Sequence, residues 1–69
     1  MPGWLTVTDI AVQLQIPEGW FRERSRAGAI RTKRESSGRY LLPNRPETLN
    51  TLRQLRAGAI RHADLTKSP

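Results

Sequence analysis

The chain is short of the residues from which enclosed chemical sites are built. It contains no cysteine and one histidine, His62, so it offers neither a disulfide framework nor a cluster of metal ligands. Aromatic residues make up 6% of its 69 residues, and a domain of this size buries only about 60% of its unfolded surface. We therefore expect no enzyme activity, no cofactor, no metal and no small-molecule substrate.

Long apolar runs are also missing. No stretch approaches the roughly 20 residues of a membrane span. The N-terminus lacks the charged and then apolar pattern of a secretory signal peptide. The sequence therefore predicts one soluble, cytoplasmic domain without a membrane partner.

Acidic residues are scarce relative to basic ones. Twelve Lys and Arg stand against six Asp and Glu, which gives a formal net charge of +6. Eleven of the twelve bases precede the last eight residues, so the excess is not a basic tail. Such a balance favours a polyanionic partner.

Two helical patterns open the chain. Thr6 and Asp9 have the spacing of a capping box, and apolar residues then recur at i, i+3, i+4 and i+7, which predicts a helix over 7–14. A turn with proline and glutamate leads to a second helix over 18–27, which Gly28 ends.

The second helix has a poor apolar face. Trp20 and Phe21 are its only large apolar residues, and the pattern leaves open which of them faces inward. Arg24 and Ser25 stand where another hydrophobic side chain would help.

A change of period follows. Residues 30–34 and 39–42 flank Glu35-Ser36-Ser37-Gly38, a turn-forming tetrad, which predicts a basic β-hairpin with Tyr40 packing on the helices. A third helix is expected over 46–57, with an apolar stripe. The stripe consists of Leu49, Leu52 and Leu55.

One hexapeptide occurs twice. Residues 26–31 and 56–61 both read Arg-Ala-Gly-Ala-Ile-Arg, while their flanks differ. We interpret the pair as two helix ends that share one stop signal, with arginine in the last turn and glycine after it.

The ordered segments resemble the MerR-type and excisionase-type helix-turn-helix domains. The residues that carry this resemblance are Leu5-Thr6-Val7-Thr8-Asp9-Ile10-Ala11, Leu14-Gln15-Ile16, Phe21, Arg26-Ala27-Gly28-Ala29-Ile30 and Gly38-Arg39-Tyr40-Leu41-Leu42-Pro43. Four positions depart from the family pattern, since Gln15 replaces a usual glycine, Pro17 a serine or threonine cap, Trp20 a threonine and Arg24 an apolar residue.

The patterns and the resemblance together imply a fold that is mainly α with a small β-hairpin, a winged helix-turn-helix. Its boundaries would be 4–60, with residues 1–3 as a loose start and residues 61–69 as a disordered tail. The helix over 18–27 would enter the major groove of double-stranded DNA, and the hairpin would hold the adjacent backbone or minor groove.

Two biological roles follow from the resemblance. The domain would act as a small regulatory or architectural factor of the bacterial nucleoid, or as the targeting domain of a bacterial or phage recombinase or transposase. Its partners would be DNA and either a recombinase or integrase, or a second copy on DNA. The alternative is a protein-interaction adaptor or homodimerisation module that uses the leucine stripe.

The expected DNA-binding residues come from the helix starts, the second helix and the hairpin. Arg22 is the best base reader, because a guanidinium can bridge guanine O6 and N7. For the helical charges the alternative is a solvated face, and for the two threonines it is simple helix capping. The full set is Thr6, Thr8, Glu18, Gly19, Arg22, Glu23, Arg26, Arg31, Lys33, Arg34 and Arg39.

Overall fold

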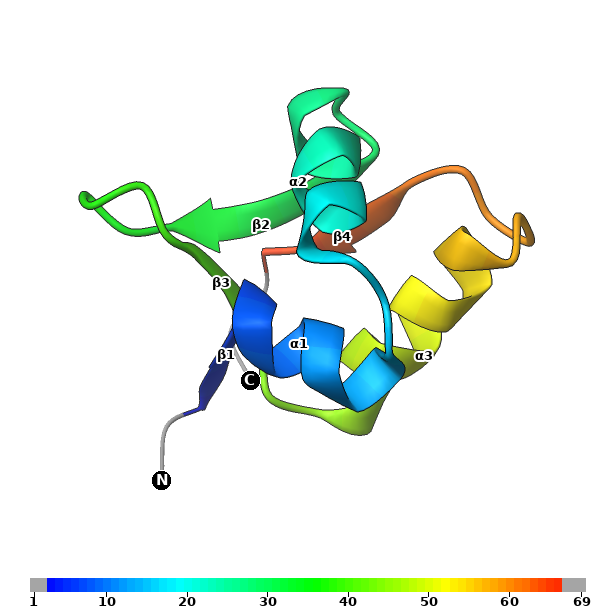
Figure 1. Cartoon of the computed structure of the whole chain (residues 1–69), viewed down its shortest axis with the longest axis horizontal. Helices are drawn as coiled ribbons and strands as arrows, with labels where there is room; N and C mark the ends of the chain where they lie inside the picture. Colours follow the sequence, from blue (N-terminus) through cyan, green and yellow to red (C-terminus); the bar gives the residue numbers. More distant parts are fainter. Residues whose placement is uncertain (1–2, 67–69) are drawn as a thin grey trace.

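A computed structural model describes residues 3–66, which form three helices and four strands (Figure 1). In chain order these are β1 (Trp4–Thr6), α1 (Val7–Leu14), α2 (Glu18–Arg26), β2 (Ile30–Arg34), β3 (Tyr40–Pro43), α3 (Pro46–Arg56) and β4 (Ala63–Leu65).

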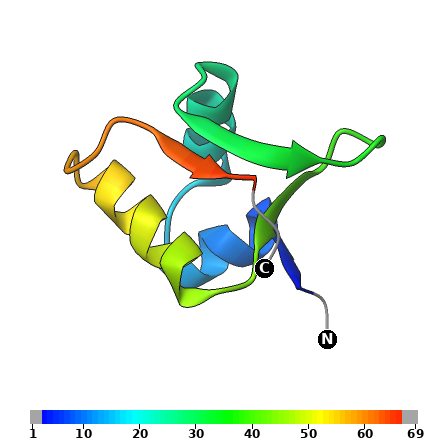
Figure 2. The same cartoon turned by 180° about the vertical axis from the view of Figure 1, so that it is seen from behind.

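The four strands make one mixed sheet in the order β1-β3-β2-β4. Strand β3 runs antiparallel to both of its neighbours, whereas β4 runs parallel to β2. Helices α1 and α2 lie behind β3 and β2 when the domain is seen from behind (Figure 2), and α3 lies next to β4 and α1. The turn between β2 and β3 projects from the body of the domain (Figure 1).

The expected fold class, a mainly α winged helix-turn-helix with one small hairpin, is wrong. The hairpin is the centre of a four-stranded sheet, so the domain is a small α/β structure. The two additional strands, β1 and β4, have three residues each. Three residues are too few to show the alternation by which strands are recognised in a sequence.

The disordered tail expected over 61–69 is also wrong where the structure describes it. Ala63 and Leu65 are buried, and β4 pairs with β2 through Ile30 opposite Ala63. The remainder of that prediction, residues 67–69, and most of the loose start, residues 1 and 2, lie outside the described residues.

The helices themselves match the sequence patterns closely. The helix over 7–14 is confirmed, and the helices expected over 18–27 and 46–57 each end one residue earlier. The second hairpin strand spans 40–43 instead of 39–42. The capping box is confirmed, because the Thr6 hydroxyl accepts from the Asp9 backbone N–H at 3.2 Å and the carboxylate accepts from the Thr6 N–H at 3.1 Å.

The turn between α1 and α2 has a left-handed residue. Gln15 takes φ 54° and ψ 48°. This is the position at which the resembled family usually has glycine, and glycine is the residue that adopts this conformation without a steric penalty. The glutamine therefore holds the tight turn at a cost in conformational energy.

The repeated hexapeptide forms two equivalent helix ends, as interpreted from the sequence. Gly28 and Gly58 have φ values of 86° and 81°. In both copies the N–H of the residue after the glycine donates to a carbonyl five residues earlier, at 2.9 Å. The two turns then lead toward β2 and β4, which are parallel neighbours.

The core settles which aromatic of α2 faces inward. Phe21 is 1% exposed, whereas Trp20 is partly buried at the edge of the core. The leucine stripe of α3 faces the same core, since Leu52 is buried and Leu49 and Leu55 pack against it. Most of the stripe is therefore used within the domain.

Candidate nucleic-acid interface

A first hollow lies where the start of α1, the middle of α2 and the hairpin turn meet. It has a volume of about 300 Å³. Its lining combines two hydroxyl groups, two guanidinium groups and the ring of the hairpin tyrosine. The lining residues are Thr6, Val7, Thr8, Arg22, Gly38, Arg39 and Tyr40.

A second hollow lies between the last turns of α2, the strands of the hairpin and the residue after β4. It has a volume of about 590 Å³. Three arginines and three residues with aliphatic hydroxyl groups contribute to its lining. The lining residues are Ser25, Arg26, Ile30, Arg31, Thr32, Arg34, Tyr40 and Thr66.

Tyr40 stands between the two hollows and lines both. Its ring meets the buried ring of Phe21 edge to face, with centroids 5.8 Å apart and planes at 69°. The Arg34 guanidinium carbon lies 4.8 Å from the centroid of the same tyrosine ring. This stack connects α2 to the hairpin, and it fixes the relative position of their arginines.

We name this surface the arginine face. It is defined by the five arginines that line the two hollows: Arg22, Arg26, Arg31, Arg34 and Arg39. Among the described lining residues of the two hollows there is no carboxylate. The surface therefore offers hydrogen-bond donors and positive charge to a ligand, which suits phosphate groups.

Glu18 holds Arg22 in place from one turn earlier on α2. Arg22 Nη1 donates to Glu18 Oε1 at 2.9 Å, and the hydroxyl of Thr8 donates to Glu18 Oε2 at 3.3 Å. Both members of the ion pair are well exposed to solvent, and such pairs contribute little to stability. Arg22 can therefore leave the carboxylate for a stronger acceptor.

A similar pair lies at the hairpin turn. Arg39 Nε is 3.3 Å from Glu35 Oε1, and the arginine side chain is 62% exposed. The carboxylate belongs to the turn itself and does not line either hollow. Arg39 is thus available to a ligand from solvent.

The structure gathers most of the predicted DNA-binding residues. Seven of the eleven line the two hollows: Thr6, Thr8, Arg22, Arg26, Arg31, Arg34 and Arg39. Glu18 touches two of these seven, Thr8 and Arg22, so it orients the Arg22 side chain. Thr6 is engaged in the helix cap, as its alternative interpretation anticipated.

Four predicted residues line neither hollow: Glu18, described above, and Gly19, Glu23 and Lys33. Gly19 and Glu23 are exposed on α2. The Lys33 Nζ atom lies 4.9 Å from the centroid of the ring of Trp4, which belongs to β1. Alternation along β2 places Arg31 and Lys33 on the face opposite to Thr32 and Arg34, so the hairpin presents its bases in two directions.

Sequence reasoning missed Ser25 and Thr32 in the second hollow. Both hydroxyl oxygens are buried, and neither has a hydrogen-bond partner. A signal was present for the first of them, because Ser25 follows Phe21 by four residues and so stands on the inward stripe of α2.

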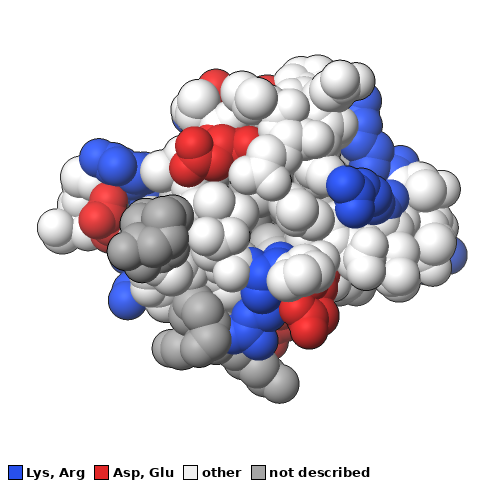
Figure 3. Space-filling view, turned by 90° about the horizontal axis from the view of Figure 1, so that it is seen from below, with Lys and Arg blue, Asp and Glu red and all other residues white. Residues whose placement is uncertain are grey.

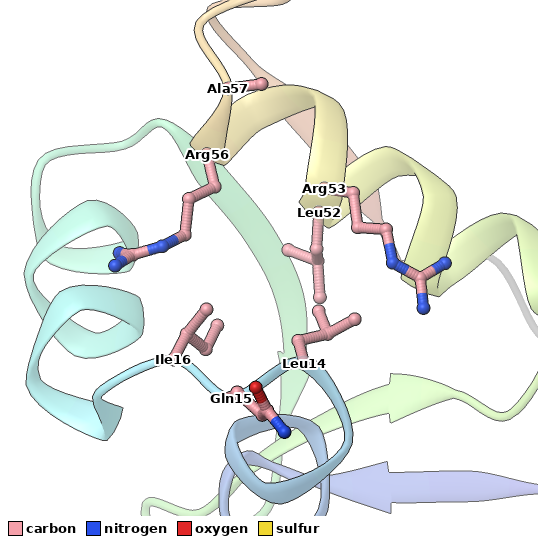
Figure 4. Close-up of a pocket in the computed structure, with 7 residues that line it drawn as sticks. All are labelled: Leu14, Gln15, Ile16, Leu52, Arg53, Arg56 and Ala57. Atoms are coloured by element: carbon pink, nitrogen blue, oxygen red, sulfur yellow. The ribbon is translucent and has the colours of Figure 1, made fainter.

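A different kind of hollow lies on the other side of the domain. It has a volume of about 370 Å³ between the α1–α2 turn and α3. Leu14, Ile16 and Leu52 point toward one another across it, and Arg53 and Arg56 point apart at its rim (Figure 4). Its interior is apolar, so it lacks the hydroxyl groups of the arginine face.

The remaining basic residues do not add to the arginine face. Seen from below, the surface carries separate basic patches, and acidic groups lie beside some of them (Figure 3). Arg24, Arg56 and Arg61 line another hollow beside Trp20, Arg53 lines the apolar hollow, and Arg45 lines a groove near β4. Five of the guanidinium groups therefore converge, and the others are distributed over the domain.

Comparisons with known proteins return no matching family model, no similar curated protein and no similar solved structure. The resemblance to MerR-type and excisionase-type domains therefore stays a prediction. Within residues 3–66, no helix has the length and apolar character to cross a membrane, and no group of three or more acidic or histidine side chains could hold a metal ion.

Proposed function

We propose that this domain binds double-stranded DNA through the arginine face. The observation that carries the proposal is the convergence of five arginines, from α2, β2 and the hairpin turn, on two adjacent hollows without a lining carboxylate. Arginine is well suited to this role because its planar donors match phosphate and guanine acceptors in pairs.

The exposed stripe of α2 would face the major groove. Gly19, Arg22, Glu23 and Arg26 occupy positions i, i+3, i+4 and i+7, so they share this stripe. The nine residues of α2 span about 14 Å, and the major groove is about 12 Å wide. Arg22 would read base edges from the middle of the helix.

The hairpin would hold the neighbouring backbone. Arg39 at the turn and Arg34 above the Tyr40 ring lie beside α2, so a duplex that contacts the helix also meets them. Phosphate contacts of this kind set the position of the protein on the duplex without reading sequence.

A salt titration tests the proposal. The logarithm of duplex affinity should fall with the logarithm of salt concentration, with a contribution to the slope of about −0.9 from each phosphate that the arginine face neutralises. Arg39→Gln should make the slope less steep by about 0.9, and Arg22→Gln should reduce discrimination between duplex sequences. A salt-independent affinity, or no duplex binding at low salt, would refute DNA binding.

The adaptor alternative has less support. Its leucine stripe packs on the domain's own core, so little of that stripe is left for a partner.

A further inference from the structure

The second hollow contains two hydroxyl groups that lack partners. Ser25 Oγ projects from α2 and Thr32 Oγ1 from β2, both oxygens are buried, and both residues line the same hollow. The great majority of buried polar side-chain atoms in folded proteins have a hydrogen-bond partner. Two exceptions beside one hollow make it the strongest candidate for a ligand site in the described residues.

The surroundings define the chemistry of that missing partner. Arg26, Arg31 and Arg34 line the hollow with the two hydroxyl groups, and none of these three guanidinium groups has a carboxylate among the described lining residues. Guanidinium groups only donate hydrogen bonds, and each hydroxyl group can donate one. A ligand that accepts at least two of these hydrogen bonds and carries negative charge fits this set.

Neighbouring polar groups are already occupied. The Thr66 hydroxyl donates to Asp64 Oδ1 at 2.6 Å, so it is satisfied within its own turn. The carbonyl groups of Arg24 and Ser25 at the end of α2 accept from backbone N–H groups of the capping turn. Ser25 Oγ and Thr32 Oγ1 are therefore the two buried hydroxyl oxygens beside this hollow that have no hydrogen-bond partner.

We propose that this hollow is a seat for one phosphodiester group of the DNA backbone, an inference that rests on the proposed function. The Arg26 and Arg34 guanidinium groups neutralise the phosphate. Ser25 and Thr32 donate to its oxygens after rotation about their Cα–Cβ bonds, which moves each hydroxyl group between staggered positions. The seat lies beside the α2 stripe, so it sets how deeply that helix enters the groove.

Removing one of these hydroxyl groups should have opposite effects on stability and on binding. Thr32→Val keeps the shape of the side chain and removes a buried group without a partner, so the melting temperature of the free domain should rise by about 4 °C. The same variant should weaken duplex binding about tenfold, because it loses a hydrogen bond to a charged group. Ser25→Ala should act in the same two directions.

Thr51→Val is the matched control, because Thr51 lies on α3 and lines neither hollow of the arginine face. Its duplex affinity should stay within twofold of the unmodified domain. Calorimetry gives the melting temperatures, and fluorescence anisotropy with a labelled 16-base-pair duplex gives the affinities. Removing a hydroxyl group that has a hydrogen-bond partner in the free domain would lower its stability. A rise in melting temperature therefore shows that the hydroxyl group has no such partner, and the loss of duplex affinity shows that it contacts DNA.

The source of the phosphate is tested with two probes. Duplexes carrying one neutral methylphosphonate linkage at successive positions should lose affinity about tenfold at one linkage, and Thr32→Val should abolish that difference. Inorganic phosphate, added at constant ionic strength, should shift the amide signals of Ser25 and Thr32 only weakly. Strong shifts with inorganic phosphate and none with duplex would identify a free-phosphate site and overturn the backbone assignment.

The experiments distinguish a refutation of the phosphate seat from a refutation of DNA binding. If Arg22→Gln weakens duplex binding and Thr32→Val and Ser25→Ala leave it within twofold, DNA binding stands and the seat is refuted. If the unmodified domain binds no duplex and inorganic phosphate shifts neither amide, both are refuted.

Discussion

The two flanks of α2 carry the same charged residue for different purposes. On one flank Arg22 and Arg26 line polar hollows shared with the hairpin. On the other flank Trp20 and Arg24 line a hollow shared with α3, where the Arg56 guanidinium carbon lies 5.2 Å from the centroid of the Trp20 ring. Phe21 and its buried ring separate the two flanks.

The difference shows that the side chains beneath an arginine determine whether its guanidinium group covers apolar surface or contributes to an anion site. Over an aromatic or aliphatic floor, a guanidinium covers apolar surface and keeps its charge in water. Beside hydroxyl groups that have no hydrogen-bond partner, the guanidinium group contributes to a site that can bind an anion. Net charge alone does not distinguish the two flanks, and the following experiments do.

The largest effect is expected where the flanks meet. Phe21→Ala removes the buried ring that packs against Tyr40 and should cost about 3–5 kcal/mol of folding free energy. A domain of this size has little stability to lose, so the variant should be largely unfolded at 25 °C by circular dichroism. A cooperative transition close to that of the unmodified domain would show that Phe21 does not join the flanks.

Exchanging arginines on one flank at a time compares the flanks directly. Arg22→Gln with Arg26→Gln should weaken duplex binding about 30-fold to 100-fold, because a base contact and a phosphate contact are lost. The control pair, Arg24→Gln with Arg56→Gln, changes the net charge equally. At 0.15 M salt, where charges act over about 8 Å, the control should bind within about threefold of the unmodified domain.

Fluorescence anisotropy at several salt concentrations measures both pairs. Equal losses for the two pairs would mean that binding follows net charge and not the arginine face.

The smallest effect is expected in the turn between α1 and α2, beside the apolar hollow. Gln15→Gly relieves a left-handed conformation that a side chain disfavours, and it should raise the free energy of unfolding by about 1 kcal/mol. Part of that gain is lost because glycine makes the unfolded chain more flexible. Urea unfolding measures the change, and duplex affinity should stay the same because Gln15 lines the apolar hollow. A destabilised variant would indicate that the glutamine side chain makes a contact that matters.

Local signals made the helices predictable. The Thr6 and Asp9 cap, and the glycines at 28 and 58, act through neighbours in the chain, and the structure shows them in those roles. The order of strands was not predictable in this way. Strand β4 exists because α3 brings Ala63 beside Ile30, a pairing that spans more than thirty residues.

The sequence predicted which residues belong to the site better than it predicted where these residues lie relative to one another. The sequence indicated the arginines of the second helix and of the hairpin, and five of them converge. It could not indicate that Lys33 would lie over Trp4, because β1, the strand that contains that tryptophan, was not recognised. It also gave no sign of the Thr32 hydroxyl, whose lack of a partner depends on how α2 packs on β2.

The sequence by itself determined where the chain turns helical, where each helix stops and which residues carry the positive charge. These properties depend on caps, glycines and spacing within a few residues. Only the tertiary structure decided that the hairpin becomes the middle of a four-stranded sheet and that Tyr40 sets Arg34 beside α2. Those outcomes depend on burying apolar surface between distant segments, and such pairings leave no periodic trace in a three-residue strand.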